Sequence, residues 1–181
     1  MVPWCQDLAT GGQEKGKHQT TPLKNLLIAT RNRGKLAELT ALLADVPFAL
    51  VSLEQAGVKQ DVNETGATLE ENASLKAATY ARLSGLQTLA DDSGLEVDAL
   101  GGDPGHLSSR WAGECATDAQ RIAFLYKKLQ NIPDKARTAR FRCVIAIALP
   151  HGPVELHSGE CQGMIIERPR GSFGFGYDPV F

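Results

Sequence analysis

Two apolar patterns alternate along the first part of this chain, and their order restricts the fold more than any other feature of the sequence. Residues 25–29 are a short, apolar, β-prone run of the kind found in buried strands. After the polar residues 30–35, leucines recur at helical spacing over residues 36–43, and Pro47 ends this helix. A second short strand is expected over residues 49–53, so the chain begins with a strand–helix–strand unit.

The remaining elements continue this alternation and then give way to strands. A helix is expected to begin at Thr68, which forms a capping-box pattern with Glu71, and to end at Gly85. A second capping box, Thr117 with Gln120, opens a helix that extends to about residue 130. The further expected strands cover residues 86–90, 139–149, 154–157 and 163–166. Strands that first alternate with helices and then dominate predict an α/β domain built on a mixed sheet.

The composition is that of one globular domain and gives no indication of a nucleic-acid or membrane partner. The chain has 181 residues, 43% of them hydrophobic, and a formal net charge of −2, so it lacks the bulk positive charge that attracts such partners. No apolar run suits a membrane span or a signal peptide, and none of the four cysteines forms a C-x-x-C pair. We therefore expect reduced thiols and a cytoplasmic protein, with a flexible extension over residues 1–24 and the domain over residues 25–181.

The polar turn after the first strand is a candidate phosphate-binding site. It consists of Thr30, Arg31, Asn32, Arg33, Gly34 and Lys35. A strand–turn–helix unit directs backbone N–H groups and the positive end of the helix toward whatever lies above the turn, and Lys35 adds a charge there. The turn matches neither the Walker A loop nor the G-x-G-x-x-G fingerprint. An ordinary solvated connection is the alternative interpretation.

A pair of adjacent aspartates directly follows the strand predicted at residues 86–90 and is a candidate metal site. Asp91 and Asp92 repel each other when both are ionised, and a divalent cation would remove this conflict. Mg²⁺ prefers oxygen ligands and usually keeps waters and substrate phosphates in its shell. Successive residues diverge in direction, so one carboxylate could hold the metal while the other faces a water. The alternative is an Asx-turn with a solvated partner.

Three further features say little individually. Glu64 is a single acidic residue before a predicted helix. Lys76 lies within an otherwise apolar helical stretch, where a lysine usually extends its charged end to solvent. In residues 174–179, two glycines flank Phe175, which leaves its ring free to stack on a flat ligand, and Asp178 could accept hydrogen bonds. A glycine-rich loop with a packed phenylalanine is the structural alternative.

Taken in order, these segments resemble the inosine triphosphate pyrophosphatase (Ham1-like) family of non-canonical purine nucleoside-triphosphate pyrophosphatases. The resemblance covers about residues 25–181 and depends on seven short segments that occur in the family's order. They are residues 29–35, 64–66, 71–77, 90–94, 101–105, 109–110 and 174–179. The resemblance implies an elongated central mixed sheet flanked by helices, two lobes with a cleft, and a cytosolic homodimer that needs Mg²⁺.

The resemblance also implies an activity and a role for each candidate residue. Family members hydrolyse inosine, deoxyinosine and xanthosine triphosphates (ITP, dITP and XTP) to the monophosphate and pyrophosphate. Asp92 would be the general base, and Lys35 and Lys76 would assist catalysis at the triphosphate. Glu64, Asp91 and Asp92 would form the metal site, and which of them touch the metal directly stays open. Substrate would be bound by residues 30–35, Lys76 and Ser93, with Phe175, Gly176, Tyr177 and Asp178 at the base.

The sequence departs from the family pattern beyond the glycine-rich loop. The family usually continues with a further lysine and a Ser-His-Arg segment, whereas Phe181 is the last residue here, so we expect a domain that lacks its C-terminal segment. Two other interpretations follow from this. The chain could be a nucleotide-binding or dimerising protein impaired in catalysis, or a pyrophosphatase of the architecturally similar Maf type with a different base preference.

Overall fold

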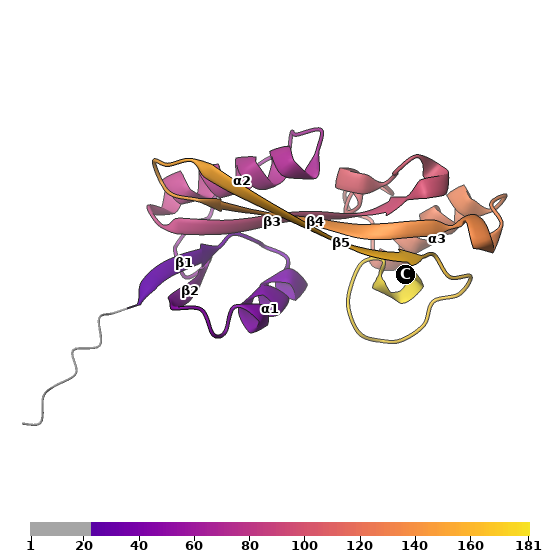
Figure 1. Ribbon diagram of the computed structural model, residues 1–181, viewed down its shortest axis with the longest axis horizontal. Coiled ribbons are helices and arrows are strands. Elements are labelled where there is room, and N and C mark those ends of the chain that lie inside the picture. The colour runs from indigo at the N-terminus through magenta and orange to yellow at the C-terminus, as the bar shows by residue number, and fades with distance from the viewer. Residues whose placement is uncertain (1–22) are drawn as a thin grey trace, which may run out of the picture.

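A mixed five-stranded sheet runs along the whole domain (Figure 1). The computed structural model describes residues 23–181, so the prediction for the N-terminal extension falls almost entirely outside the described residues, and Lys24 already belongs to the first strand. The strands β1 (Lys24–Ile28), β2 (Phe48–Ser52), β3 (Gln87–Val97), β4 (Thr138–Ala148) and β5 (Val154–Met164) lie in the order β2-β1-β3-β4-β5. β1 pairs in parallel with β2 and β3, whereas β3, β4 and β5 pair antiparallel, which confirms the predicted α/β class.

Helices flank the sheet on both faces. They are α1 (Arg33–Leu42), α2 (Leu69–Ser84) and α3 (Asp118–Leu129), with single 3-10 turns at Asp98–Leu100, Gly105–Leu107, Asp134–Ala136 and Asp178–Val180. α2 and α1 lie on opposite faces of the sheet beside β1 (Figure 1). β1 is accordingly apolar on both faces: Leu27 packs in the core under α2, while Leu26 and Ile28 pack with the leucines of α1.

Besides the apolar cluster under α1, two larger apolar cores lie toward opposite ends of β3 and β4 and correspond to the two predicted lobes. In the first, residues of α2 such as Ala73 and Ala77 pack against Ala90 and Val144. The second gathers around Leu95 and includes α3 and the C-terminal residues of the chain. The long strands are shared, so any group placed near the middle of β3 lies between the lobes.

The predicted helix starts are confirmed by their caps. The Thr68 hydroxyl accepts the backbone N–H of Glu71 at 3.1 Å. The Glu71 carboxylate, however, accepts the backbone N–H of Ala67 rather than that of Thr68. Thr117 and Gln120 form the complete reciprocal capping box. Because each cap satisfies N–H groups that have no partner inside the helix, both helices begin where the sequence predicted.

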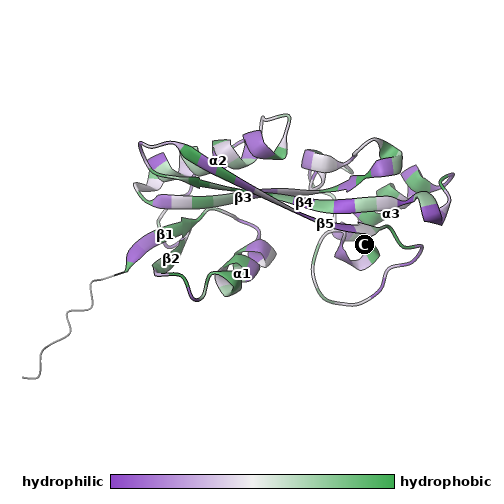
Figure 2. Ribbon diagram, viewed as in Figure 1, coloured by the Kyte–Doolittle hydropathy of each residue, from purple (hydrophilic) through white to green (hydrophobic). Residues whose placement is uncertain are grey.

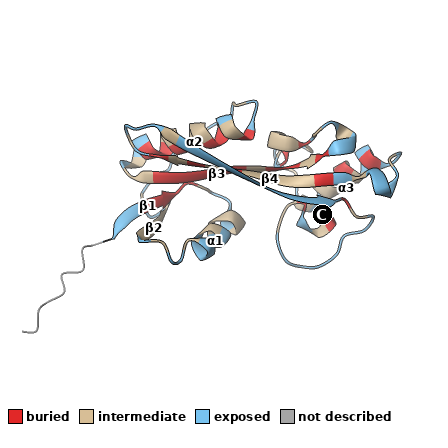
Figure 3. Ribbon diagram, in the orientation of Figure 1, coloured by how far each residue is buried: buried red, intermediate tan, exposed pale blue. Residues whose placement is uncertain are grey.

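Two predictions about strands are wrong. β3 does not end at residue 90 but continues to Val97, and residues 91–94 pair with β4, which excludes an Asx-turn there. The two short strands expected at residues 154–157 and 163–166 are one strand, β5, most of which is exposed (Figure 3) and polar (Figure 2). In both cases backbone hydrogen bonds to β4 keep the polar residues in a strand. These residues have no alternating apolar pattern from which the strand could be predicted.

The remaining sequence expectations concern thiols and membrane spans. Cys115, Cys143 and Cys161 are free thiols, as predicted, while Cys5 lies outside the described residues. Within residues 23–181, none of the helices has the length and apolar character needed to cross a membrane.

Candidate active site

The turn after β1 is held in shape by its own side chains. Asn32 is the N-cap of α1, because its Oδ1 accepts the N–H groups of Gly34 at 2.8 Å and Lys35 at 3.2 Å. The Thr30 hydroxyl in turn accepts the N–H of Asn32 at 3.2 Å. Asparagine is a preferred N-cap residue, so this role could have been predicted and was missed. The turn therefore brings the positive end of α1 to the edge of the sheet.

Two lysines and three carboxylates from separate elements form an ion-pair cluster beside this turn. Lys35 Nζ, from α1, lies 2.6 Å from Asp91 Oδ2 on β3. Lys76 Nζ, from α2, lies 2.8 Å from Glu64 Oε1 and 3.2 Å from Asp92 Oδ1. Lys76 does not extend to solvent, because its side chain is only 12% exposed. The structure thus gathers all five residues, while their catalytic and metal-binding roles stay predictions.

The cluster shifts the pKa values of its members in different directions. Burial raises the pKa of Asp92 above its ordinary value, and Lys76 offsets this only in part. Burial alone would also raise the pKa of Glu64, but Lys76 and Arg110 hold it below the ordinary value. Burial opposes the charge of Lys76, yet Asp92 and Glu64 raise its pKa, so this lysine is a cation at neutral pH.

Two arginines fix the loop that carries Glu64. The Arg31 guanidinium donates to the carbonyls of Lys59 and Gln60, each at 2.9 Å, and forms an ion pair with Asp61. Arg110 lies 3.1 Å from the Glu64 carboxylate. Arg110 belonged to one of the recognised segments but had no predicted role. Arg31 was predicted to bind substrate, and its guanidinium contacts in the structure are to the loop over residues 58–61.

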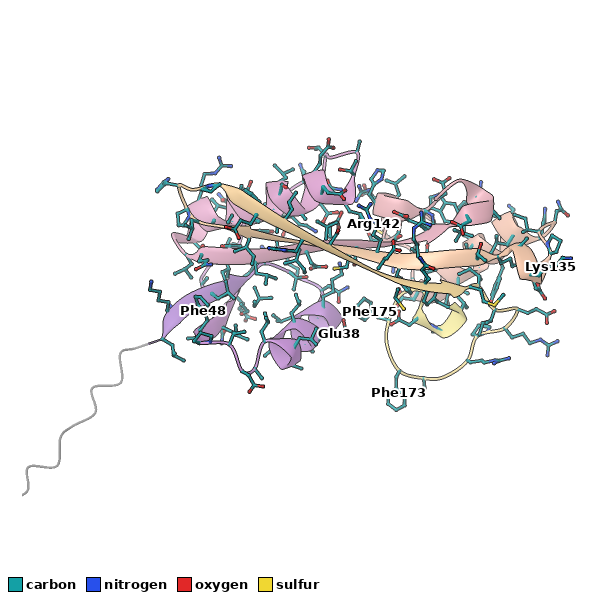
Figure 4. All side chains as sticks on the ribbon, viewed as in Figure 1. Glu38, Phe48, Lys135, Arg142, Phe173 and Phe175 are labelled. Atoms are coloured by element: carbon teal, nitrogen blue, oxygen red, sulfur yellow. The ribbon has the colours of Figure 1, made fainter. Side chains whose placement is uncertain are left out.

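The glycine-rich loop over residues 174–178 folds around Asp178. One carboxylate oxygen of Asp178, Oδ2, accepts the N–H of Phe175 at 2.9 Å, which leaves Oδ1 for another partner. Gly174 has φ of 83°, and a Cβ there would lie 2.2 Å from the same carboxylate, so only glycine fits. The Phe175 ring packs over Gly34 at the start of α1, and Figure 4 shows it directed toward that helix, whereas Phe173 points away.

One cavity of about 530 Å³ brings nearly all predicted site residues together. Its lining includes Thr30, Arg31, Asn32, Lys35, Glu64, Lys76, Asp91, Asp92, Ser93, Phe175, Gly176, Tyr177 and Asp178, but not Arg33 or Gly34. Residues that sequence reasoning missed also line it, among them Asp61, Tyr80, His106, Asp118 and Arg121. This volume is in the range of small-molecule sites.

The carboxylates of this cavity fit a divalent cation that shares its shell with substrate. In the described residues, no three acidic, histidine or cysteine side chains are already arranged as a metal-binding group, and Lys76 bridges Glu64 and Asp92. Asp92 Oδ2, however, is buried without a hydrogen-bond partner. Mg²⁺ is commonly held by one or two carboxylates together with substrate phosphates and waters, so a complete protein cage is not needed.

Comparisons with known proteins agree on one group of relatives. A model of the Ham1 family matches residues 26–181. The dITP/XTP pyrophosphatase of Geobacter sulfurreducens is 50% identical over 159 residues, which cover 88% of this chain and 80% of that protein. The corresponding protein of Halalkalibacterium halodurans is 46% identical, with 88% and 82% covered.

Solved structures give the same result. A HAM1 protein from Coxiella burnetii superposes with a TM-score of 0.79 at 42% identity, covering 87% of this chain and 81% of that one. A nucleoside-triphosphatase, also named dITP/XTP pyrophosphatase, from Mycobacterium abscessus superposes with a TM-score of 0.74 at 44% identity, with 87% and 82% covered.

Proposed function

Because this chain belongs to the Ham1 family, we propose that it hydrolyses non-canonical purine nucleoside triphosphates such as dITP, XTP and ITP to the monophosphate and pyrophosphate. The observation that carries the proposal is the single cavity that joins the lysine–carboxylate cluster to the loop containing Phe175 and Asp178. The names of the relatives support the substrate class. They favour this activity over a Maf-type pyrophosphatase and over a protein without catalysis.

The cluster supplies what hydrolysis at the α–β linkage requires. A water attacks the phosphorus in line, Asp92 accepts the water's proton, and the bond to the departing pyrophosphate breaks. The raised pKa of Asp92 suits a general base that works closer to neutral pH. Lys35 and Lys76, which are paired with carboxylates in the structure, would donate to the phosphate oxygens and offset the charge that develops on pyrophosphate.

The other end of the cavity would select the base. The Phe175 ring offers a flat apolar face for stacking. A 6-oxopurine presents an N1–H donor, whereas adenine presents a bare N1 acceptor, so the free carboxylate oxygen of Asp178 accepts from the first and repels the second. Guanine also carries N1–H, so Asp178 alone does not exclude it.

The cofactor that we propose is Mg²⁺, at a site formed by Glu64, Asp91 and Asp92, of which one or two carboxylates would contact the ion directly. Bound there, it would supply positive charge that polarises the phosphate oxygens. The buried, unpartnered Oδ2 of Asp92 supports this choice, since a buried carboxylate oxygen needs a donor or a cation. A homodimer in the cytoplasm completes the proposal. The dimer derives from the family resemblance alone, whereas the cytoplasmic location is also expected from the apolar pattern and the cysteines of the sequence.

Product analysis tests this function directly. The purified chain is incubated with dITP, XTP, dATP or dGTP, with Mg²⁺ or with a chelator, and the released pyrophosphate and phosphate are separated by ion chromatography. We expect pyrophosphate from dITP and XTP, in the presence of Mg²⁺, at rates well above those with dATP. Release of free phosphate, or the absence of any product from all four nucleotides, would contradict the proposal.

A further inference from the structure

The first turn of α3 reaches into the cavity and holds the base loop, although nothing in the sequence gave it a functional role. Asp118 is the first residue of α3, and its Oδ2 accepts the backbone N–H of Gly176 at 2.8 Å. Gly176 lies directly between Phe175, the proposed stacking residue, and the segment that carries Asp178. Asp118 itself lines the cavity. This bond connects two segments that are 58 residues apart in the chain.

Arg121 orients the Asp118 carboxylate. Its Nη1 forms an ion pair with the other oxygen of Asp118, Oδ1, and its Nε donates to the carbonyl of Ser109 at 2.8 Å. The Arg121 side chain is only 20% exposed, and it also lines the cavity. The carboxylate is therefore fixed from one side by a guanidinium that is itself anchored to a neighbouring loop, which leaves Oδ2 directed at Gly176.

The base loop needs such an external support because glycine dominates it. Gly176 has φ of 63° and Gly174 has φ of 83°, and both have more backbone freedom than any other residue in their place. The bond from Phe175 to Asp178 stabilises the loop internally, and Tyr177 anchors the loop to the second core and to Ser108, but neither contact holds the peptide group between Phe175 and Gly176. The charge-assisted bond to Asp118 holds that peptide group, which directly follows Phe175 in the chain.

We propose that Asp118, oriented by Arg121, is a positioning residue for purine recognition. It fixes the Gly176 peptide so that Phe175 and Asp178 face the base, and it contacts no phosphate. The inference rests on the proposed function of the cavity, and it predicts that loss of Asp118 weakens binding of the base end of the substrate while binding of the phosphate end is unchanged.

The experiment measures binding at the base end and at the phosphate end of the substrate separately, in three variants. Asp118→Ala removes the acceptor, whereas Asp118→Asn keeps an oxygen for the Gly176 N–H. Asp134→Ala is the matched control. Asp134 also forms an ion pair with an arginine three residues later, Arg137, at 2.8 Å, but it does not line the cavity. Binding of dIMP by calorimetry reports the base end, inhibition by inorganic tripolyphosphate reports the phosphate end, and KM and kcat are measured with dITP.

We expect Asp118→Ala to weaken dIMP binding and to raise KM for dITP about tenfold, which corresponds to about 1.4 kcal/mol. The inhibition constant of tripolyphosphate should stay within about twofold of the unaltered chain, since the proposed phosphate ligands are untouched. Asp118→Asn should recover most of the loss, because the amide oxygen accepts the same bond. Asp134→Ala should match the unaltered chain in all three measurements.

Two outcomes would overturn the inference. Unchanged dIMP binding in Asp118→Ala would show that Asp118 does not position the base loop. An equal loss of dIMP and tripolyphosphate binding would show a general collapse of the cavity. If the unaltered chain binds dIMP but releases no pyrophosphate from dITP, the proposed function fails, while the binding comparison still decides the role of Asp118. If it hydrolyses dITP but binds no detectable dIMP, the KM comparison for dITP decides the role of Asp118, and if it binds neither dIMP nor dITP, both proposals fail.

Discussion

At the scale of single residues, Asp92 is the position at which the environment and the proposed chemistry agree most closely. Its carboxylate is buried, pairs with Lys76 through one oxygen, and leaves the other without a partner. The charges of the two lysines nearly cancel those of the three carboxylates. The cluster can therefore stay buried when no substrate is bound. A bound triphosphate would attract the lysines, which would free the carboxylates for a cation and a water.

Replacing Asp92 by Asn tests the general-base role. We expect kcat for dITP to fall about 10²- to 10⁴-fold, because an amide cannot accept the proton, while dITP binding remains measurable. Steady-state kinetics and calorimetry give the two quantities. The exposed Asp45→Asn in the turn after α1 serves as the control and should leave kcat unchanged. An Asp92→Asn enzyme with a near-normal rate would refute the role.

Asp178 gives a second prediction at this scale, which concerns base choice. In Asp178→Asn the side chain gains an N–H donor that adenine N1 can accept, so the preference for dITP over dATP in kcat/KM should fall about tenfold or more. Competition between the two nucleotides in one reaction measures the ratio. A preference equal to that of the unaltered chain would remove Asp178 from the account of specificity.

At the scale of elements, β3 depends on a glycine because a loop crosses it closely. A Cβ on Gly94 would lie 2.0 Å from the carbonyl oxygen of Gly105 and 2.9 Å from the Ser108 hydroxyl. That hydroxyl accepts the N–H of Leu95, so the loop is bonded to the strand at the place where a side chain would intrude. This approach also brings the loop over residues 105–109 to the cavity.

Gly94→Ala should therefore destabilise the domain by roughly 1–3 kcal/mol, since backbone atoms rather than a flexible side chain must move. Urea denaturation followed by circular dichroism measures the change. Gly159→Ala on β5 is the matched control, because a Cβ there meets no atom within 4 Å. Equal stability of the two variants would show that the contact between β3 and the loop is not tight in solution.

The elements also show how far sequence reasoning reaches. The two helices that begin with a threonine cap were predicted well, since Thr68 and Thr117 act through neighbours only a few residues away. The continuation of β3 through Asp91 and Asp92 was missed, because it depends on pairing with β4, about fifty residues later. The site residues Asp118 and Arg121 were missed for a similar reason: locally they look like an ordinary helix start, and only the fold brings them to the base loop.

At the scale of the whole molecule, the cavity is assembled from both lobes. The core under α2 supports the helix that carries Lys76, and the aspartates follow Ala90 of that core along β3. The second core includes Tyr177 of the loop that would contact the base. Tyr177 belongs to this second core: it is 3% exposed, and its hydroxyl donates to the carbonyl of Ser108 at 3.3 Å. The ionisation of Tyr177 therefore reports on whether this second core is intact.

Alkaline pH should unfold the domain partly through Tyr177. Burial raises the pKa of its phenol from the ordinary 10.0 to about 12, so the folded state holds this proton more tightly than the unfolded chain does. The resulting stabilisation, at most about 3 kcal/mol, is complete below about pH 10 and is lost as the pH rises through 12. Urea denaturation at several pH values should show a shallower decline for Tyr177→Phe than for the unaltered chain. Because other groups titrate identically in both proteins, equal slopes would mean that Tyr177 is solvated in the folded state and that the second core is looser than the structure shows.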